Sequence, residues 1–185
     1  MKALDRFGQS WRFRKACPYI PEGSRIFDVG CFDGALFRRL RKHIAFGVGI
    51  DPEPIESLEG DNYRLIRGHF PQDAPKTGDF DVVTMLASLE HIPDKDLGEV
   101  SECCAGLLKP GGLLIITVPS PIVDQIVAGL QFLRLADGMS IHQHYGFNPN
   151  RTPIIFEGFE LIRHEKFQLG LNNLFVMRKI EGFRA

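Results

Sequence analysis

A glycine-bearing turn stands near the start of the chain, where Asp28-Val-Gly-Cys-Phe-Asp-Gly34 directly follows a β-branched and aromatic run. Gly30 and Gly34 allow a tight turn and let the backbone approach a ligand closely, which a residue with a Cβ does at greater cost. The spacing is not the dinucleotide-binding pattern GxGxxG, because Phe32 and Ala35 occupy the second and third glycine positions. The segment therefore predicts a ligand-binding turn and disfavours a pyrophosphate cradle.

A carboxylate follows one strand later, where Asp51 ends the run Gly47-Val-Gly-Ile-Asp51. At a strand tip, such a carboxylate can accept hydrogen bonds from both hydroxyls of a ribose. Taken alone, an Asp at a strand end is more often a helix cap or a turn residue. Its pairing with the Gly30 turn favours the interpretation as a ribose ligand.

Histidines lie where a proton acceptor would be useful: His91 follows the apolar run Phe80–Leu86, and His142 and His144 lie in a later irregular segment. An imidazole suits proton removal near neutral pH, so His91 and His144 are candidate catalytic bases. The alternatives are local packing or capping for His91, and local hydrogen bonding in a polar loop for His144. The His-x-His pair supplies only two ligands and lacks a nearby cysteine or acidic pair, so no metal site is predicted.

Short apolar runs alternate with amphipathic stretches from residue 24 onward, which indicates βαβ units and an α/β fold. We expect a doubly wound, mostly parallel seven-stranded sheet with helices on both faces and an antiparallel C-terminal hairpin strand. The expected strands are Ser24–Val29, Phe46–Ile50, Arg64–Arg67, Phe80–Leu86, Leu113–Val118, Phe159–Leu169 and Leu174–Lys179. The expected helices are Gly34–Ile44 and Lys95–Leu108, the second capped by Asp94. Ligands of such sheets bind at the carboxyl ends of the strands, where the candidate residues fall.

The order and spacing of these motifs resemble the class I S-adenosylmethionine-dependent methyltransferases, in the small branch with a DVGCxxG-type first motif. The resemblance covers residues 24–118 closely and the C-terminal hairpin more loosely. Asp28–Gly34 resembles the first motif, and Asp51 resembles the ribose-binding acid. Phe80–Ile92 resembles the fourth-strand motif with its Leu-Glu-His-Ile sequel, and Leu107–Ile116 resembles the segment that enters the fifth strand.

The resemblance implies a Rossmann-like methyltransferase fold with S-adenosyl-L-methionine as the cofactor. The Gly30–Gly34 turn would pack against its methionine and ribose portions, with Asp28 near the methionine ammonium and Asp51 at the ribose. The main chain of Met85–Ala87 would border the methionine portion and the transferable methyl group. The implied cofactor-binding residues are Asp28, Gly30, Cys31, Phe32, Gly34, Asp51, His69, Phe70, Met85, Leu86 and Ala87.

Two positions depart from the family pattern. Phe32 replaces the middle glycine of the first motif, and would crowd the turn unless its ring points away from the ligand. Gly68-His69-Phe70 replaces the acid that often follows the third strand and meets the adenine amino group. These departures leave open a module that senses S-adenosylmethionine or its product S-adenosylhomocysteine without turnover. A nucleotide-dependent oxidoreductase is disfavoured by the glycine spacing.

Length and composition bound the remaining expectations. The 185 residues, 44% of them hydrophobic, predict a single domain over residues 1–185, with an acceptor-site insert over residues 120–153. A formal net charge of -1 provides no excess of positive charge for nucleic acid. The four cysteines show neither metal-site nor disulfide spacing, and no apolar stretch is long enough to cross a bilayer. We expect a cytoplasmic enzyme with free thiols and a small-molecule acceptor, methylated on O or N, in an undetermined oligomeric state.

The first residues are locally basic and carry Trp11 and Phe13. A solvated or frayed N-terminal segment is the simpler interpretation. Residues 1–20 could instead hold an acidic substrate or form a lid, since exclusion of water strengthens electrostatic interactions in a site.

Overall fold

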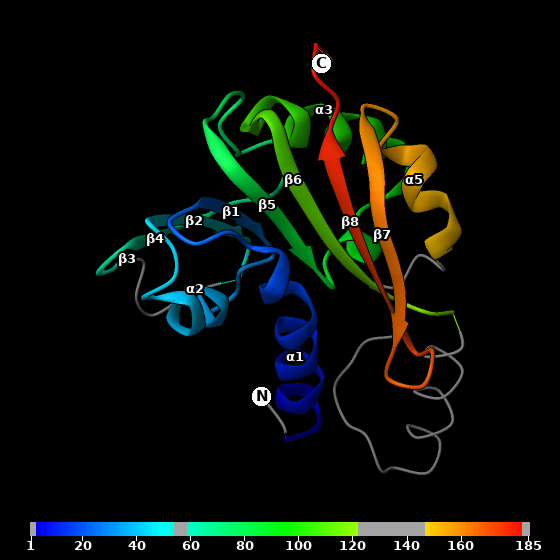
Figure 1. Cartoon of the computed structure of the whole chain (residues 1–185), viewed down its shortest axis with the longest axis horizontal. Helices are drawn as coiled ribbons and strands as arrows, with labels where there is room; N and C mark the ends of the chain where they lie inside the picture. Colours follow the sequence, from blue (N-terminus) through cyan, green and yellow to red (C-terminus); the bar gives the residue numbers. More distant parts are fainter. Residues whose placement is uncertain (1–2, 54–58, 122–146, 183–185) are drawn as a thin grey trace.

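A computed structural model describes residues 3–53, 59–121 and 147–182. Its strands form one mixed sheet in the order β3-β4-β2-β1-β5-β6-β8-β7 (Figure 1). The strands are β1 Arg25–Val29, β2 Phe46–Asp51, β3 Glu59–Gly60, β4 Tyr63–Arg67, β5 Phe80–Leu86, β6 Leu108–Pro119, β7 Phe159–Phe167 and β8 Asn172–Lys179. Strands β4, β2, β1, β5 and β6 pair in parallel, while β8 pairs antiparallel with β6 and β7. The predicted seven-stranded sheet is confirmed, and the two-residue β3 adds an antiparallel edge to β4.

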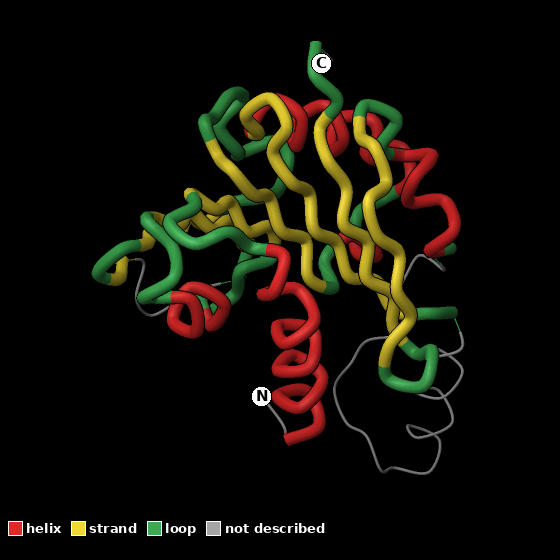
Figure 2. The backbone as a smooth tube through the Cα atoms, viewed as in Figure 1, coloured by secondary structure: helices red, strands yellow, loops and turns green. Residues whose placement is uncertain are grey.

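Helices cover both faces of the sheet, as predicted (Figures 1 and 2). The α-helices are α1 Ala3–Ala16, α2 Ala35–Leu40, α3 Leu97–Leu107 and α5 Thr152–Ile155, and the 3-10 turns are η1 Cys17–Tyr19, η2 Leu89–His91, η3 Asp94–Asp96 and η5 Pro149–Arg151. Residues of α1 and α2 contribute to the core on one face, and residues of α3 and α5 to the core on the other. Neighbouring residues of β1 divide between these cores: Ile26 packs on the α2 side, and Phe27 packs on the α3 side. This two-sided burial explains why the central strands are almost continuously apolar.

Three local expectations need correction. Asp94 does not cap the helix before β6, because its carboxylate pairs instead with Arg151 Nη1 at 2.8 Å and the α-helix begins only at Leu97. The N-terminal segment, predicted to be solvated or frayed, forms the regular helix α1 over Ala3–Ala16 and is therefore not frayed there. The helix after the first motif ends at Leu40, four residues earlier than expected. The stretch 122–146, which holds most of the predicted insert, lies outside the described residues.

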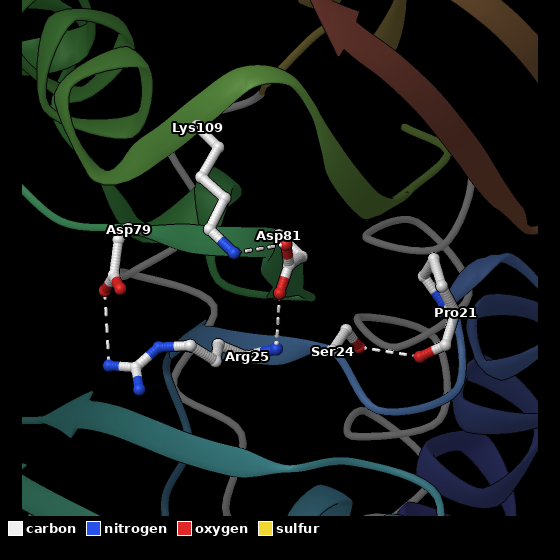
Figure 3. Close-up of polar contacts among 6 residues, drawn as sticks. All are labelled: Pro21, Ser24, Arg25, Asp79, Asp81 and Lys109. Atoms are coloured by element: carbon white, nitrogen blue, oxygen red, sulfur yellow. Dashed lines mark hydrogen bonds and ion pairs between the residues drawn. The ribbon is translucent and has the colours of Figure 1, made fainter.

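A polar clasp joins three strands at the end of the sheet opposite their carboxyl ends (Figure 3). Asp81 Oδ2 accepts a hydrogen bond from the Arg25 backbone N–H at 2.8 Å, and Asp81 Oδ1 accepts one from Lys109 Nζ at 2.7 Å. Partial burial opposes ionisation of this carboxyl, but the two donors together hold the pKa of Asp81 below its usual range. The Arg25 guanidinium separately meets the more exposed Asp79 at 3.2 Å. Asp81 therefore ties β1, β5 and β6 together.

We expect Asp81→Asn to lower the free energy of unfolding by about 1 kcal/mol at neutral pH, because charge-assisted hydrogen bonds to Arg25 and Lys109 are weakened. A carboxyl with a depressed folded-state pKa stabilises the protein above its unfolded pKa and loses this contribution as the pH falls. The deficit should therefore shrink in acid, as measured by urea unfolding at several pH values. Asp79→Asn is the matched control and should change stability by less than half as much; equal effects of the two variants would contradict the role of the clasp.

Candidate active site

A cavity of about 770 Å³ opens at the carboxyl ends of the parallel strands. Its lining comes from the segments that follow β1, β2, β4 and β5, together with residues of η2 and η3. The sequence-predicted residues that line it are Gly30, Asp51, His69, Phe70, Ala87 and His91. A volume of this size is typical of small-molecule and cofactor sites. The topology thus brings candidates that are far apart in sequence to one cavity.

Gly30 sits where β1 comes closest to the segment after β5. Its φ is +76°, and a Cβ built on it would lie 2.7 Å from Ser88 Cβ. Ser88 is fixed in this place because its hydroxyl donates to the Val29 carbonyl at 2.9 Å. The backbone N–H of Gly30 donates to the Ile50 carbonyl of β2 at 2.9 Å. The turn therefore requires glycine for both its conformation and its space.

Asp51 is the buried carboxylate of the cavity, with 7% of its surface exposed. Its Oδ2 accepts a hydrogen bond from the Phe32 backbone N–H at 2.8 Å, and its Oδ1 accepts one from the Glu53 backbone N–H at 2.9 Å. The two bonds fix the carboxylate plane. Each oxygen keeps a further lone pair, so the group can still accept the two hydroxyls of a ribose.

Asp28 is buried, with 4% of its surface exposed, and is not among the residues that line the cavity. Its Oδ1 accepts a hydrogen bond from Thr84 Oγ1 at 2.5 Å. Burial raises the pKa of Asp28 to about 7, against the opposing effect of the Thr84 hydrogen bond and with a smaller contribution from the charge of Asp51. Near neutral pH this carboxyl can therefore gain or lose its proton when the charge of neighbouring groups such as Asp51 changes.

The ring of Phe32 points away from the cavity. Its backbone adopts a φ of +45°, and its side chain is 44% exposed in a second hollow of about 570 Å³ that it shares with Ser10 and Phe13 of α1. The bulk of the ring therefore does not enter the cavity, although the family pattern has glycine at this position. Cys31 is turned to the interior against β2, where a Cβ on Gly49 would lie 2.6 Å from its sulfur.

Other predicted residues lie around the cavity rather than in it. Gly34 is the left-handed N-cap of α2, Met85 is fully buried in the core, and Leu86 packs against the core on the α2 side. Ala87 is the member of the Met85–Ala87 segment that lines the cavity, with its N–H donating to the Thr117 carbonyl at 2.9 Å. His144 lies outside the described residues.

The proposed lid residues Trp11 and Phe13 pack against the core on the α2 side and are absent from the lining of the cavity. The role of residues 1–20 as a lid stays a prediction.

Sequence reasoning missed several polar lining residues, namely Glu53, Asp73, Ser88 and Asp96. Asp73 matters most, because its Oδ2 accepts a hydrogen bond from the His69 N–H at 2.8 Å. The loop after β4 thus does present an acid to the cavity, four residues beyond the position where the family pattern places one. The available signal was its location in a loop that follows a parallel strand.

Residues 3–53, 59–121 and 147–182 contain no group of three or more His, Cys, Asp or Glu residues arranged to hold a metal ion. None of their helices combines the length and apolar character needed to span a membrane. All four cysteines are free.

Comparison with known proteins identifies the family. Residues 4–154 match the model of the family described as "Methyltransferase domain", so the chain belongs to this family, whose methyl donor is S-adenosylmethionine. Among curated relatives, the ubiquinone biosynthesis O-methyltransferase of Xanthomonas axonopodis is 36% identical over 106 residues, covering 52% of this chain and 44% of that protein. The corresponding protein of Marinobacter nauticus is 34% identical over 106 residues, with 51% and 44% covered. The chain thus spans a little under half of the length of these relatives.

Solved structures confirm the fold. A methyltransferase in a complex with the Haloferax volcanii Trm112 methyltransferase activator aligns with a TM-score of 0.73 at 17% identity, covering 99% of this chain and 96% of that one. An S-adenosylmethionine-dependent methyltransferase from Mesorhizobium loti aligns with a TM-score of 0.69 at 16% identity, covering 90% and 96%. The Rossmann-like methyltransferase architecture therefore extends over nearly the whole chain.

We expect Gly30→Ala to destabilise the protein by about 1–3 kcal/mol and to weaken binding of S-adenosylhomocysteine at least about tenfold, because strain and the Ser88 clash displace the turn. Thermal unfolding and calorimetric titration measure the two effects. Gly111→Ala is the control, since Gly111 has a φ of +73° but open space around its Cβ position. It should lose some stability and no affinity; equal loss of affinity in both variants would contradict the assignment.

We expect Asp28→Asn to stabilise the ligand-free protein increasingly as the pH rises. In the folded protein the pKa of Asp28 is raised from 3.8 to about 7. The contribution of this group to the free energy of unfolding is therefore fully present below pH 3.8 and is lost as the pH rises through about 7. Asparagine stays neutral and can accept the Thr84 hydrogen bond, so the gain should reach up to about 4 kcal/mol above neutral pH. Urea unfolding across about pH 5 to 8 tests this, and a pH-independent difference would refute it.

Proposed function

We propose that this chain transfers the methyl group of S-adenosylmethionine to an oxygen atom of a small organic acceptor. The observation that carries the proposal is the Asp51 carboxylate, which the Phe32 N–H of the first motif holds at the edge of a cavity also lined by Gly30 and His91. A carboxylate, a close backbone turn and a histidine thus line the same cavity. Together they can bind an adenosyl sulfonium and accept a proton beside it.

The residues present fit the cofactor. Asp51 has acceptor capacity for both ribose hydroxyls, and the Gly30 turn leaves space for a ligand next to the backbone. Asp73, held by the His69 N–H, offers a carboxylate to an amino group such as that of adenine. The apolar Phe70 and Ile92 also line the cavity and offer contacts for a purine ring.

A bound S-adenosylmethionine supplies a methyl carbon that an acceptor oxygen takes by direct displacement, leaving a neutral thioether and releasing one proton from the hydroxyl. The protein mainly has to align the acceptor, which can lower the barrier by about 7–11 kcal/mol. We assign the released proton to His91, which lies at the end of η2 and lines the cavity. His144 remains a second candidate base from the sequence alone.

The oxygen specificity rests on the curated relatives, whose names describe O-methylation in ubiquinone biosynthesis. Because the chain covers under half of those proteins, the acceptor itself is a matter for experiment. A panel of phenols, alcohols and amines should be incubated with S-adenosylmethionine. Release of S-adenosylhomocysteine should accompany a one-methyl mass gain on a hydroxyl compound. If the protein binds the cofactor tightly but methylates no compound of the panel, the proposed transferase activity is contradicted and a sensing module is favoured.

With an acceptor in hand, we expect His91→Gln to lower kcat by about a hundredfold or more, because glutamine cannot take up a proton. Affinity for S-adenosylhomocysteine, measured by titration calorimetry, should change less than about threefold. His43→Gln is the matched control: the His43 ring is bonded to the Ile20 carbonyl and does not line the cavity. If His91→Gln retains full turnover, another group is the base.

A further inference from the structure

The cavity is lined by an excess of acidic side chains. Asp51, Glu53, Asp73 and Asp96 all contribute to its surface. Within the described part of the chain, no Lys or Arg lines it, although Lys and Arg together number 22 in a protein with a net charge of -1. The charged side chains of the described lining are thus all acidic, whereas the protein as a whole is nearly neutral.

The four carboxylates approach the cavity from different sides. Asp51 and Glu53 follow β2, Asp73 lies in the loop after β4, and Asp96 belongs to η3 before α3. Backbone N–H donors offset part of the charge of Asp51 and Asp73. Among the described residues, neither Glu53 nor Asp96 forms an ion pair, so the described part of the lining carries a negative formal charge.

The methyl donor and its product differ in a way that such a field can distinguish. S-adenosylmethionine carries a sulfonium cation, and S-adenosylhomocysteine carries a neutral thioether, while their ammonium, carboxylate, ribose and adenine groups are the same. The donor therefore carries one positive charge more than the product, and acidic side chains in the cavity attract it more strongly. Carboxylates several ångströms from a charge in a partly solvated site each change affinity by about threefold to tenfold.

We propose that the acidic lining, through Glu53 and Asp96 in particular, makes this site bind the sulfonium donor more tightly than the thioether product. This inference rests on the proposed function, because it concerns the same cavity and the same cofactor. Methyl transfer then removes the charge that holds the ligand, so product release is favoured by the reaction itself. Glu53 and Asp96 become specificity-determining residues through their side-chain carboxylates. Glu53 bonds to the ribose acid Asp51 through its backbone N–H, so a change of its side chain leaves that donor in place.

Titration calorimetry with the two compounds tests the proposal without any acceptor. The wild-type protein should bind S-adenosylmethionine about tenfold more tightly than S-adenosylhomocysteine at about 20 mM salt. The ratio should fall toward about threefold at about 500 mM salt, because screening weakens the charge-dependent part alone. Equal affinities, or tighter product binding, at low salt would overturn the inference. A donor-to-product affinity ratio that does not change with salt concentration would also overturn it.

Variants assign the effect to residues. Asp96→Asn and Glu53→Gln should each reduce the donor-to-product affinity ratio by about threefold while leaving the affinity for S-adenosylhomocysteine nearly unchanged. Glu99→Gln is the matched control, because Glu99 is exposed in the first turn of α3 and does not line the cavity. Unchanged ratios in both cavity variants would refute the role of these carboxylates. If well-folded protein binds neither compound, the proposed function fails as well; if it binds both equally, only this inference fails.

Discussion

The hydrogen bond from the Phe32 N–H to Asp51 Oδ2 joins the tips of two neighbouring parallel strands, and the site is arranged around it. It can form only because β1 and β2 pair in register, with Val29 opposite Ile50. The Ile50 carbonyl also accepts the N–H groups of Gly30 and Cys31, so the turn after β1 is anchored on β2 at several points. The carboxylate is thereby presented to the cavity in one orientation before any ligand arrives, which reduces the ordering cost of binding.

The site concentrates features that oppose stability. Phe32 adopts a left-handed conformation that costs an ordinary residue about 1 kcal/mol or more, and Asp28 is a buried acid whose ionisation is unfavourable. Asp28 lies near the end of β1, and Phe32 lies in the turn that follows this strand. The surrounding core compensates, since Phe27 and Ile26 on either side of the strand are fully buried. Local strain beside a ligand cavity is consistent with a turn whose conformation is selected for binding rather than for folding.

The sequence predicted the central architecture well because its signals were local and redundant. A run such as Phe80–Leu86, apolar at nearly every position, can be satisfied only by burial on both faces, and it became β5 between β1 and β6. The candidate residues at strand ends reached one cavity for the same topological reason. What failed depended on partners distant in sequence: Asp94 meets Arg151, 57 residues away, rather than capping its own helix.

The orientation of side chains could also not be predicted from local sequence patterns. The pattern around Phe32 left two orientations open, and the packing of α1 against the first motif provides the hollow that receives the ring. Asp73 was overlooked because its contact with His69 depends on how the loop after β4 folds back on itself.

The most direct measurement of the central claim is a high-resolution structure of the protein with S-adenosylhomocysteine bound. We expect both ribose hydroxyls within hydrogen-bonding distance of the Asp51 carboxylate, with the Phe32 N–H bond to that carboxylate intact. A ligand seated elsewhere, or one whose ribose leaves Asp51 bonded only to the backbone, would contradict it.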